Sequence, residues 1–531
     1  MMRMEESEEK QEIEREDSTE EQLEEAGEEW KRVPPWTKQI TVRGVIASLL
    51  IGSLYSIILM KLVLTTGVVP NLNVSAALLA FVLIRGWTKV LQKFGFVTPP
   101  FTRQENTVIQ TCTVACYSIA MAGGFGSYLL GLYKNTYQLA GVNTEGNTSG
   151  NYKEPQVGWM TGYLLASTFV GILALSPLRK ILLRFRHDLR WSRNDLFPSC
   201  EFVFTPGGCA FLGHNYEESE WLQEYKNQSS DDRQKNELFM RESIPIWLAY
   251  AGYLFFSIVS IIVIPKMFPQ LKWYFVLVAY VVAPSLCFCN AYGTGLTDMN
   301  MSINYGKVAL FVIASIVGKD SGVVAALVGC GVVKSVVHTS ADLMHDFKTG
   351  HLTLTSPRSM VLSQLVGTAI GCILGPLSFF LYYKTFDVGN PNGEFKAPFA
   401  LIYRNMAILG VQGFSALPQH CLQLCYGFFA FAVGASMVRD LSPPKIGKWM
   451  PLPMAMAVPF IVGANFAIDM CVGSLIVYVW HKVNKKKASM MVTAVASGLI
   501  CGDGLWILPS SILALAKVNP PICMTFLPFR K

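Results

Sequence analysis

The side chains that could do chemistry gather in one polar stretch, residues 342 to 358, between two long apolar segments. Its charged groups include Asp342, Asp346 and Lys348, together with an arginine and two histidines. Ionisable residues within or beside membrane segments are costly to place there and therefore mark proton or substrate pathways. We predict a short helical turn that is broken at Gly350 and ended by Ser356-Pro357. The alternative interpretation is a solvated loop between two spans.

Three further aspartates lie in or at the end of apolar runs, namely Asp298, Asp469 and Asp503. Asp298 closes a glycine-rich stretch that begins at Asn290, and this amide joins the candidate transport residues. Each aspartate is either a site for a proton or a cationic substrate, or the N-cap of a half-helix that begins there. Nothing near Asp469 requires a cap, which favours function. The glycines around Asp503 leave both interpretations open.

Patterns for a resident metal or an enzyme are weak. His420, Cys421 and Cys425 share one helical face, which is compatible with a soft-metal site but favours helix packing, because cysteine replaces alanine freely in tight bundles. The H-E-x-x-H pattern of zinc proteases is absent. We therefore predict neither an enzyme nor a resident metal or cofactor.

The composition is that of a membrane protein. Of the 531 residues, 51% are hydrophobic and only 15% are charged, whereas soluble domains have about one quarter charged residues. Twelve apolar runs follow one another along the chain, and several reach the roughly 20 residues that one crossing needs. We predict an all-α fold, a polytopic transmembrane helix bundle in the lipid bilayer, with no nucleic-acid partner.

Some of these runs carry helix breakers. Residues 318 to 322 (Gly-Lys-Asp-Ser-Gly) split one apolar run into two halves, and Pro284 and Pro376 lie inside others. Interrupted helices of this kind expose backbone dipoles in secondary transporters. Gly367, Gly371 and Gly375 form a ridge for close helix packing. We favour packing within the chain, with a homodimer seam as the alternative.

Charge asymmetry predicts the orientation in the membrane. Residues 31 to 43 hold four basic side chains before the first apolar run, and residues 65 to 73 after it are uncharged. By the positive-inside rule the N-terminus is cytoplasmic. Residues 133 to 156 should then be extracytoplasmic, and their Asn147-Thr148-Ser149 sequon predicts an N-glycosylation site.

The amino-acid sequence of the polar stretch resembles that of a known family. The run D-L-M-x-D-x-K-T-G-H from Asp342 is similar to a signature of the oligopeptide transporter superfamily, and its continuation L-T-L-T-S-P-R-S-M resembles the plant Yellow Stripe-Like branch. Residues 34–44, 71–80, 100–111, 396–405, 413–418 and most of 449–524 also resemble that branch.

The resemblance implies a proton-coupled symporter of transition-metal chelates. The cargo would be a metal-nicotianamine or metal-phytosiderophore complex, with iron, zinc or copper carried as part of the substrate. Such a protein recognises the chelate and does not ligate the ion. We expect it in the plasma membrane, with an internal membrane as the alternative.

One part of the chain departs from the family. After residue 180 the family continues into further spans with a Y-P-S-G-type motif, which is absent here. We predict an acidic cytoplasmic tail (1–33), an N-terminal transmembrane bundle (34–184), an atypical polar segment replacing family spans (185–242) and a C-terminal transmembrane bundle (243–531). Two alternatives follow: a transport-incompetent partner that assembles with complete relatives, or a small-peptide transporter.

Overall fold

The structure is a computed structural model of the whole chain. It describes residues 33–65, 67, 72–95, 99–142, 144, 147, 151–175, 239, 242, 244–297, 300–318, 321–391, 393, 395–413, 419–441, 464–485 and scattered positions between 453 and 509. The segments predicted as an acidic tail (1–33) and as a replacement for family spans (185–242) lie outside the described residues, apart from Val33, Phe239 and Glu242.

The described residues form helices and no strand. The first part of the chain forms α2 (Trp36–Gln39), α3 (Val42–Thr65), α4 (Asn73–Lys93), α5 (Arg103–Ala122), η1 (Leu130–Leu132), α6 (Lys134–Leu139) and α7 (Val157–Ala174). The second part forms α11 (Ile246–Met267), α12 (Trp273–Thr297), α13 (Ser302–Val317), α14 (Gly322–Thr353), α15 (Pro357–Thr385), α16 (Pro398–Gln412), α17 (Cys421–Leu441) and α20 (Ala464–Val483). Eight of the described helices are long and apolar enough to cross a membrane. The predicted all-α membrane fold is confirmed.

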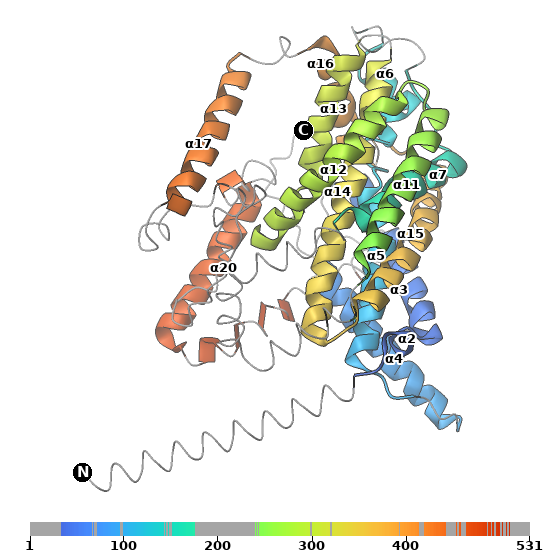
Figure 1. The fold of residues 1–531 in the computed structure, drawn as a ribbon, viewed down its shortest axis with the longest axis vertical. Helices are drawn as coiled ribbons and strands as arrows, with labels where there is room; N and C mark the ends of the chain where they lie inside the picture. The colour runs from blue at the N-terminus through green and yellow to red at the C-terminus, as the bar shows by residue number, and fades with distance from the viewer. Residues whose placement is uncertain are drawn as a thin grey trace, which may run out of the picture.

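Helix α14 lies at the centre of the bundle (Figure 1). It packs against α5, α7, α12, α13 and α16, and its most apolar 18-residue window is entirely buried. A helix that is enclosed on all sides needs close neighbours, and Gly331 provides one such approach. A Cβ on Gly331 would collide with the Tyr128 ring and the Tyr163 hydroxyl. The same hydroxyl donates to the Val328 carbonyl at 2.7 Å, which ties α7 to α14.

The polar stretch that the sequence analysis placed in a short turn belongs instead to the end of α14. The predicted break at Gly350 is wrong, because the helix continues to Thr353. Gly350 serves packing there, since a Cβ would collide with the Met360 sulfur. The predicted stop at Ser356-Pro357 is confirmed, because Pro357 is the first residue of α15. Asp346 and His351 of this stretch are buried against neighbouring helices, whereas Lys348 is exposed.

The predicted helix interruptions differ in outcome. The split at residues 318 to 322 is confirmed: α13 ends at Gly318, whose φ of +83° favours glycine, and α14 begins at Gly322. By contrast, α12 and α15 continue through Pro284 and Pro376.

The glycine ridge of α15 packs inside the chain. Cβ atoms on Gly367 and Gly371 would collide with the Cys112 and Cys116 carbonyl oxygens of α5, and one on Gly375 would lie 3.1 Å from the Phe125 ring. Intramolecular packing is therefore confirmed as the use of this ridge.

The predicted glycosylation site at Asn147 is wrong for this fold. Asn147 is fully buried, and its Oδ1 accepts from Arg404 Nε at 3.2 Å and Nη2 at 2.7 Å. Arg404 also donates to the Gly131 and Asn151 carbonyls, at 2.7 and 2.8 Å. A glycan would be attached at Nδ2, which is buried and donates to the Tyr137 and Gly141 carbonyls at 3.2 and 2.8 Å.

A lysine, Lys153, holds the loop between α6 and α7 against α11. Lys153 Nζ donates to the Met267 carbonyl at 2.6 Å and lies 4.1 Å from the centroid of the Phe268 ring. Partial burial lowers the pKa of Lys153 from its ordinary value. The contact therefore fixes the loop beside the end of α11.

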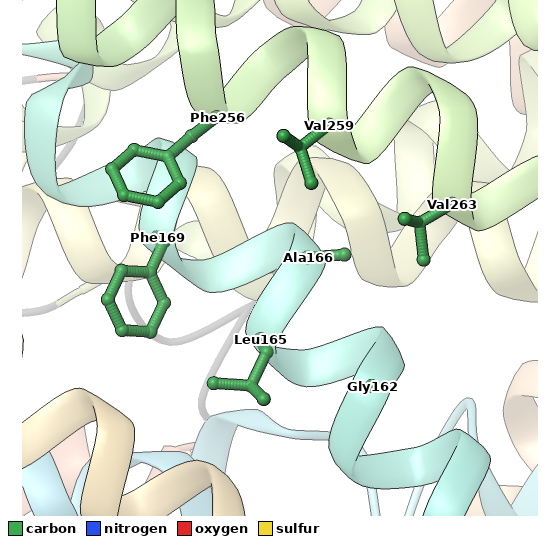
Figure 2. Close-up of a pocket in the computed structure, with 7 residues that line it drawn as sticks. All are labelled: Gly162, Leu165, Ala166, Phe169, Phe256, Val259 and Val263. Carbon is green, nitrogen blue, oxygen red and sulfur yellow. The ribbon is translucent and has the colours of Figure 1, made fainter.

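Two features lie outside the packed centre. Helices α17 and α20 lie apart from the bundle (Figure 1), and most of their described side chains are exposed. A groove between α7 and α11 (Figure 2) is lined by Gly162, Leu165, Ala166, Phe169, Phe256, Val259 and Val263. Since no charged or hydrogen-bonding side chain lines this groove, it suits hydrocarbon and not a charged cargo.

Candidate functional site

A row of ionisable side chains follows one side of α14. Lys334, His338, Asp342 and Asp346 succeed one another at intervals of four residues. Each interval covers about 6 Å along the axis and turns about 40° further around the helix, so the row winds slowly. Lys334, His338 and Asp346 are each at most 4% exposed, and the Asp342 side chain is 17% exposed. This α14 polar row is the candidate functional site.

His338 and Asp342 form the pair at its middle. Their Nε2 and Oδ2 atoms lie 3.3 Å apart, within ion-pair distance. The geometry does not suit a directed hydrogen bond, because His338 Nε2 has no such partner in the described chain. We regard the pair as an electrostatic contact, since attraction between charges does not require a linear N–H···O arrangement.

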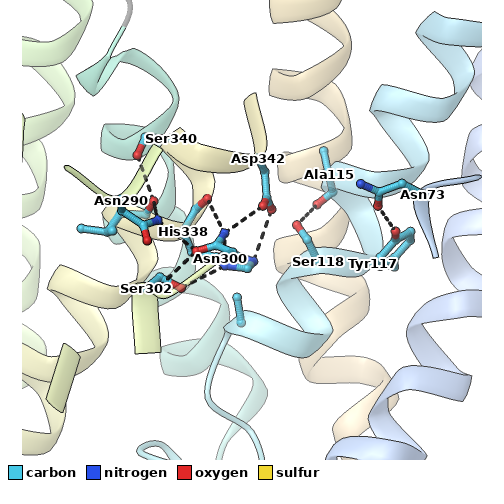
Figure 3. A network of polar contacts seen from close by, with 12 residues as sticks. Asn73, Ala115, Tyr117, Ser118, Asn290, Asn300, Ser302, His338, Ser340 and Asp342 are labelled. Atoms are coloured by element: carbon cyan, nitrogen blue, oxygen red, sulfur yellow. Dashed lines mark hydrogen bonds and ion pairs between the residues drawn. The ribbon is translucent and has the colours of Figure 1, made fainter. Parts of the chain in front are cut away.

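Two asparagines from neighbouring elements orient this pair (Figure 3). Asn300 Nδ2 lies 3.1 Å from Asp342 Oδ1 and 3.0 Å from His338 Nδ1. Asn300 Oδ1 accepts from Asn290 Nδ2 at 3.0 Å and from the Ser302 backbone N–H at 3.1 Å. Asn290 Oδ1 in turn accepts from the Met301 backbone N–H at 3.1 Å.

These backbone contacts determine the protonation pattern. A backbone N–H only donates, so the amide atoms facing Ser302 and Met301 must be oxygens, and both amide groups are oriented without ambiguity. Asn300 Nδ2 is then a donor to His338 Nδ1, which must accept. The neutral imidazole therefore carries its proton on Nε2, facing Asp342.

Asp346 lies one helical turn further on. It is 1% exposed, and its Oδ2 has no hydrogen-bond partner among the described residues. Tyr117 of α5 lies close enough to interact electrostatically with Asp342 and Asp346, and its hydroxyl donates to Asn73 Oδ1 at 2.6 Å (Figure 3). A buried carboxylate with a free oxygen is a place where a proton or a cationic group can bind.

The structure brings together only part of the predicted site. Asn290, Asp342 and Asp346 lie in or beside the α14 polar row, whereas Lys348 is exposed on the other side of the same helix. Asp469 is exposed on α20. Asp298 and Asp503 lie outside the described residues.

Sequence reasoning missed Lys334, His338, Asn300 and Ser302. The available signal was the spacing of four residues, which extends from the polar stretch back into the preceding apolar run. The amide of Asn300 carried no such signal, because only the packing of α12 and α13 on α14 brings it to the pair.

Comparison with known proteins gives the family. A family model described as OPT oligopeptide transporter protein matches residues 39–200 and 184–514. The metal-nicotianamine transporters YSL2 and YSL3 of Arabidopsis thaliana are each 52% identical to the chain; the alignments cover 93% of this chain and 96% of YSL2, and 97% of this chain and 98% of YSL3. The iron-phytosiderophore transporter YSL15 of Oryza sativa subsp. japonica is 47% identical, over 94% of this chain and 95% of the relative.

The helical bundle and its buried polar row, together with these matches, define a multi-pass integral membrane transporter and not an enzyme. The chain belongs to the oligopeptide transporter family and, within it, to the Yellow Stripe-Like branch of metal-nicotianamine transporters. The alignment with YSL2 extends over 639 positions, more than the 531 residues of this chain. These relatives therefore contain residues that have no counterpart here.

Proposed function

We propose that the chain is a proton-coupled symporter of transition-metal chelates, with the His338–Asp342 pair as its proton site. The supporting observation is the burial of His338 and Asp346, with the 17%-exposed Asp342 between them, on the helix that lies at the centre of the bundle. Ionisable groups in such a place are characteristic of proton relays in transporters. The cargo would be an iron, zinc or copper complex of nicotianamine or a phytosiderophore, as the names of the relatives suggest.

The pair can take up one proton if the Asn300 amide changes its contact with His338. Neutral His338 beside ionised Asp342 carries a net charge of −1. An added proton has a place on His338 Nδ1, where the Ser302 hydroxyl, 3.2 Å away, can turn from donor to acceptor, and the Asn300 N–H that lies 3.0 Å away must then turn aside. The resulting imidazolium faces the Asp342 carboxylate, which stabilises it. Proton uptake thus changes the charge of the site by one without opening the bundle.

Proton-driven uptake by the full chain in proteoliposomes tests this assignment. Acidification of the outside should stimulate uptake of iron-nicotianamine by the wild type. We expect His338→Gln and Asp342→Asn to lose this stimulation while remaining folded in detergent. Lys348→Gln, on the exposed side of the same helix, is the matched control and should retain it. Unchanged stimulation in both site variants would contradict the proposal.

Two observations favour a second candidate function, that of a transport-incompetent partner that assembles with complete relatives. The alignment with YSL2 is longer than the chain. The two ranges matched by the family model overlap at residues 184–200. If family spans are absent there, the bundles that move against each other in alternating access are incomplete.

Rescue of an iron-uptake-deficient yeast separates the two candidates. A partner protein gives no rescue alone, but it should co-purify with a complete relative and regain uptake when the relative's residues are grafted at positions 184–200. Efficient uptake of the chelate by the unmodified chain would exclude the partner role. Competition by a dipeptide, and not by metal-free nicotianamine, would instead indicate a peptide transporter. A fluorescent fusion tests our placement in the plasma membrane.

A further inference from the structure

The first member of the α14 polar row, Lys334, lies in an aromatic setting built by four elements. Its Nζ is 5.2 Å from the centroid of the Tyr128 ring. Tyr128 lies 6.4 Å, centroid to centroid, from Tyr403 of α16. Lys307 of α13 has its Nζ 6.0 Å from the Tyr403 ring. Two ammonium groups therefore border two neighbouring tyrosine rings, and we call these four residues the lysine–tyrosine cluster.

Two glycines bring the cluster together. A Cβ on Gly306 would lie 3.1 Å from Lys334 Cβ and 3.1 Å from Cys330 Sγ, so α13 approaches α14 closely at this level and carries Lys307 with it. Gly331, one turn before Lys334, leaves room for the Tyr128 ring. The site is thus produced by tight packing of α13 and α14 and not by a mobile surface loop.

The charge of this cluster is not balanced. Lys334 is 4% exposed, and among the described residues no carboxylate lies within ion-pair distance of Lys334 or Lys307. Lys307 is close enough to act on Lys334 as a like charge. A buried ammonium without a counter-ion is unfavourable, and a second one nearby adds to the cost. Tyrosine rings attract a cation through their faces but do not neutralise it.

We infer that the lysine–tyrosine cluster binds a carboxylate of the amino-acid part of the cargo. This inference rests on the proposed function, since nicotianamine and phytosiderophores carry carboxylates. A carboxylate between the two ammonium groups would supply the missing counter-ion, and the tyrosine rings would cover the aliphatic part of the ligand. Lys334 precedes His338 by one helical turn, which places carboxylate recognition next to the proton site on the same helix.

Direct binding of metal-free nicotianamine and of iron-nicotianamine to the full chain in lipid nanodiscs tests the inference. A charge-assisted contact contributes about 1.5 to 3 kcal/mol, so Lys334→Met should weaken binding by about 10- to 100-fold. Lys307→Met should weaken it less, because Lys307 is only half-buried. Lys334→Arg, which keeps the charge, should restore part of the binding. Lys348→Met is the matched control, an exposed lysine of the same helix, and should bind as the wild type does.

Thermal unfolding without ligand distinguishes binding from a structural role. If Lys334 serves a ligand, removing its unpaired charge should leave the unfolding temperature unchanged or raise it. If Lys334 is structural, Lys334→Met should unfold at a lower temperature. Should that variant fail to fold, Lys307→Met at its half-buried position carries the test.

The outcomes separate this inference from the proposed function. Wild-type binding that does not change in Lys334→Met and Lys307→Met overturns the inference and leaves chelate transport intact. If the wild type binds no form of nicotianamine, the proposed cargo is wrong, and citrate then serves as the probe. Lysine-dependent citrate binding would support a carboxylate site for another cargo, whereas citrate binding that ignores both lysines, or no citrate binding, would overturn it.

Discussion

The centre of the bundle and its C-terminal helices differ in how far they bury their charged and their large apolar side chains. In α14 Lys334, His338 and Asp346 are buried, and Asn300, which is held by Asn290, donates a directed hydrogen bond to Asp342. In α17 large apolar side chains such as Phe428 and Phe429 are more than half exposed, and in α20 Asp469 is exposed as well.

The difference teaches which aspartate has an environment suited to coupling. Sequence context gave Asp469 and Asp342 similar standing, since both lie in or beside apolar runs. Only Asp342 has a histidine 3.3 Å away and an amide donor 3.1 Å away. A carboxylate with polar partners inside the bundle has surroundings that a change of conformation can alter, whereas Asp469 is exposed and has no such partners among the described residues.

The largest effect that sharpens this comparison should come from Arg404→Met. The change leaves the Gly131 and Asn151 carbonyls and the Asn147 amide without their donor in a buried place. Each unsatisfied group costs about 1 to 3 kcal/mol, so a large fall in the unfolding temperature is expected in a detergent-solubilised melting assay. Arg439→Met on α17 is the control and should change it little. Equal falls in both variants would mean that the two regions are equally packed.

A smaller effect is expected for Gly371→Ala on α15. Its Cβ would collide with the Cys116 carbonyl of α5, and such overpacking costs about 1 to 3 kcal/mol. The matched change Gly434→Ala on α17 meets nothing within 4 Å and should stabilise the helix by up to about 1 kcal/mol. The signs of the two melting-temperature changes should therefore be opposite, and the same sign in both would break the comparison.

The smallest effect is expected for Ser149→Ala, which removes the sequon but keeps Asn147. Because Asn147 is buried and bonded to Arg404, we expect no glycan there and no change in electrophoretic mobility after this substitution. Asn147→Gln, which misplaces the amide, should instead lower the unfolding temperature. A mobility shift caused by Ser149→Ala alone would show that the loop is accessible to glycosylation.

The sequence alone determined the class of this protein and most of its spans. Apolar runs of about 20 residues are unfavourable in water and require a bundle in a bilayer, so helices such as α3, α7 and α15 follow from their composition alone. Gly318 as a break and Pro357 as a helix start were also readable, because their backbone restrictions are local. The motif that begins at Asp342 indicated the Yellow Stripe-Like branch, and the comparisons with known proteins gave the same branch.

Only the tertiary structure decided which polar residues act together. Composition marked residues 342 to 358 as too polar for lipid, yet α14 continues through most of them because neighbouring helices replace much of the lipid around it. By its sequence Asn147 is part of a surface sequon, but in the fold it accepts a hydrogen bond from Arg404, which is 257 residues away. Lys334 and His338 were not among the predicted site residues. Burial and hydrogen bonding between distant segments are properties of packing, and the local sequence does not contain them.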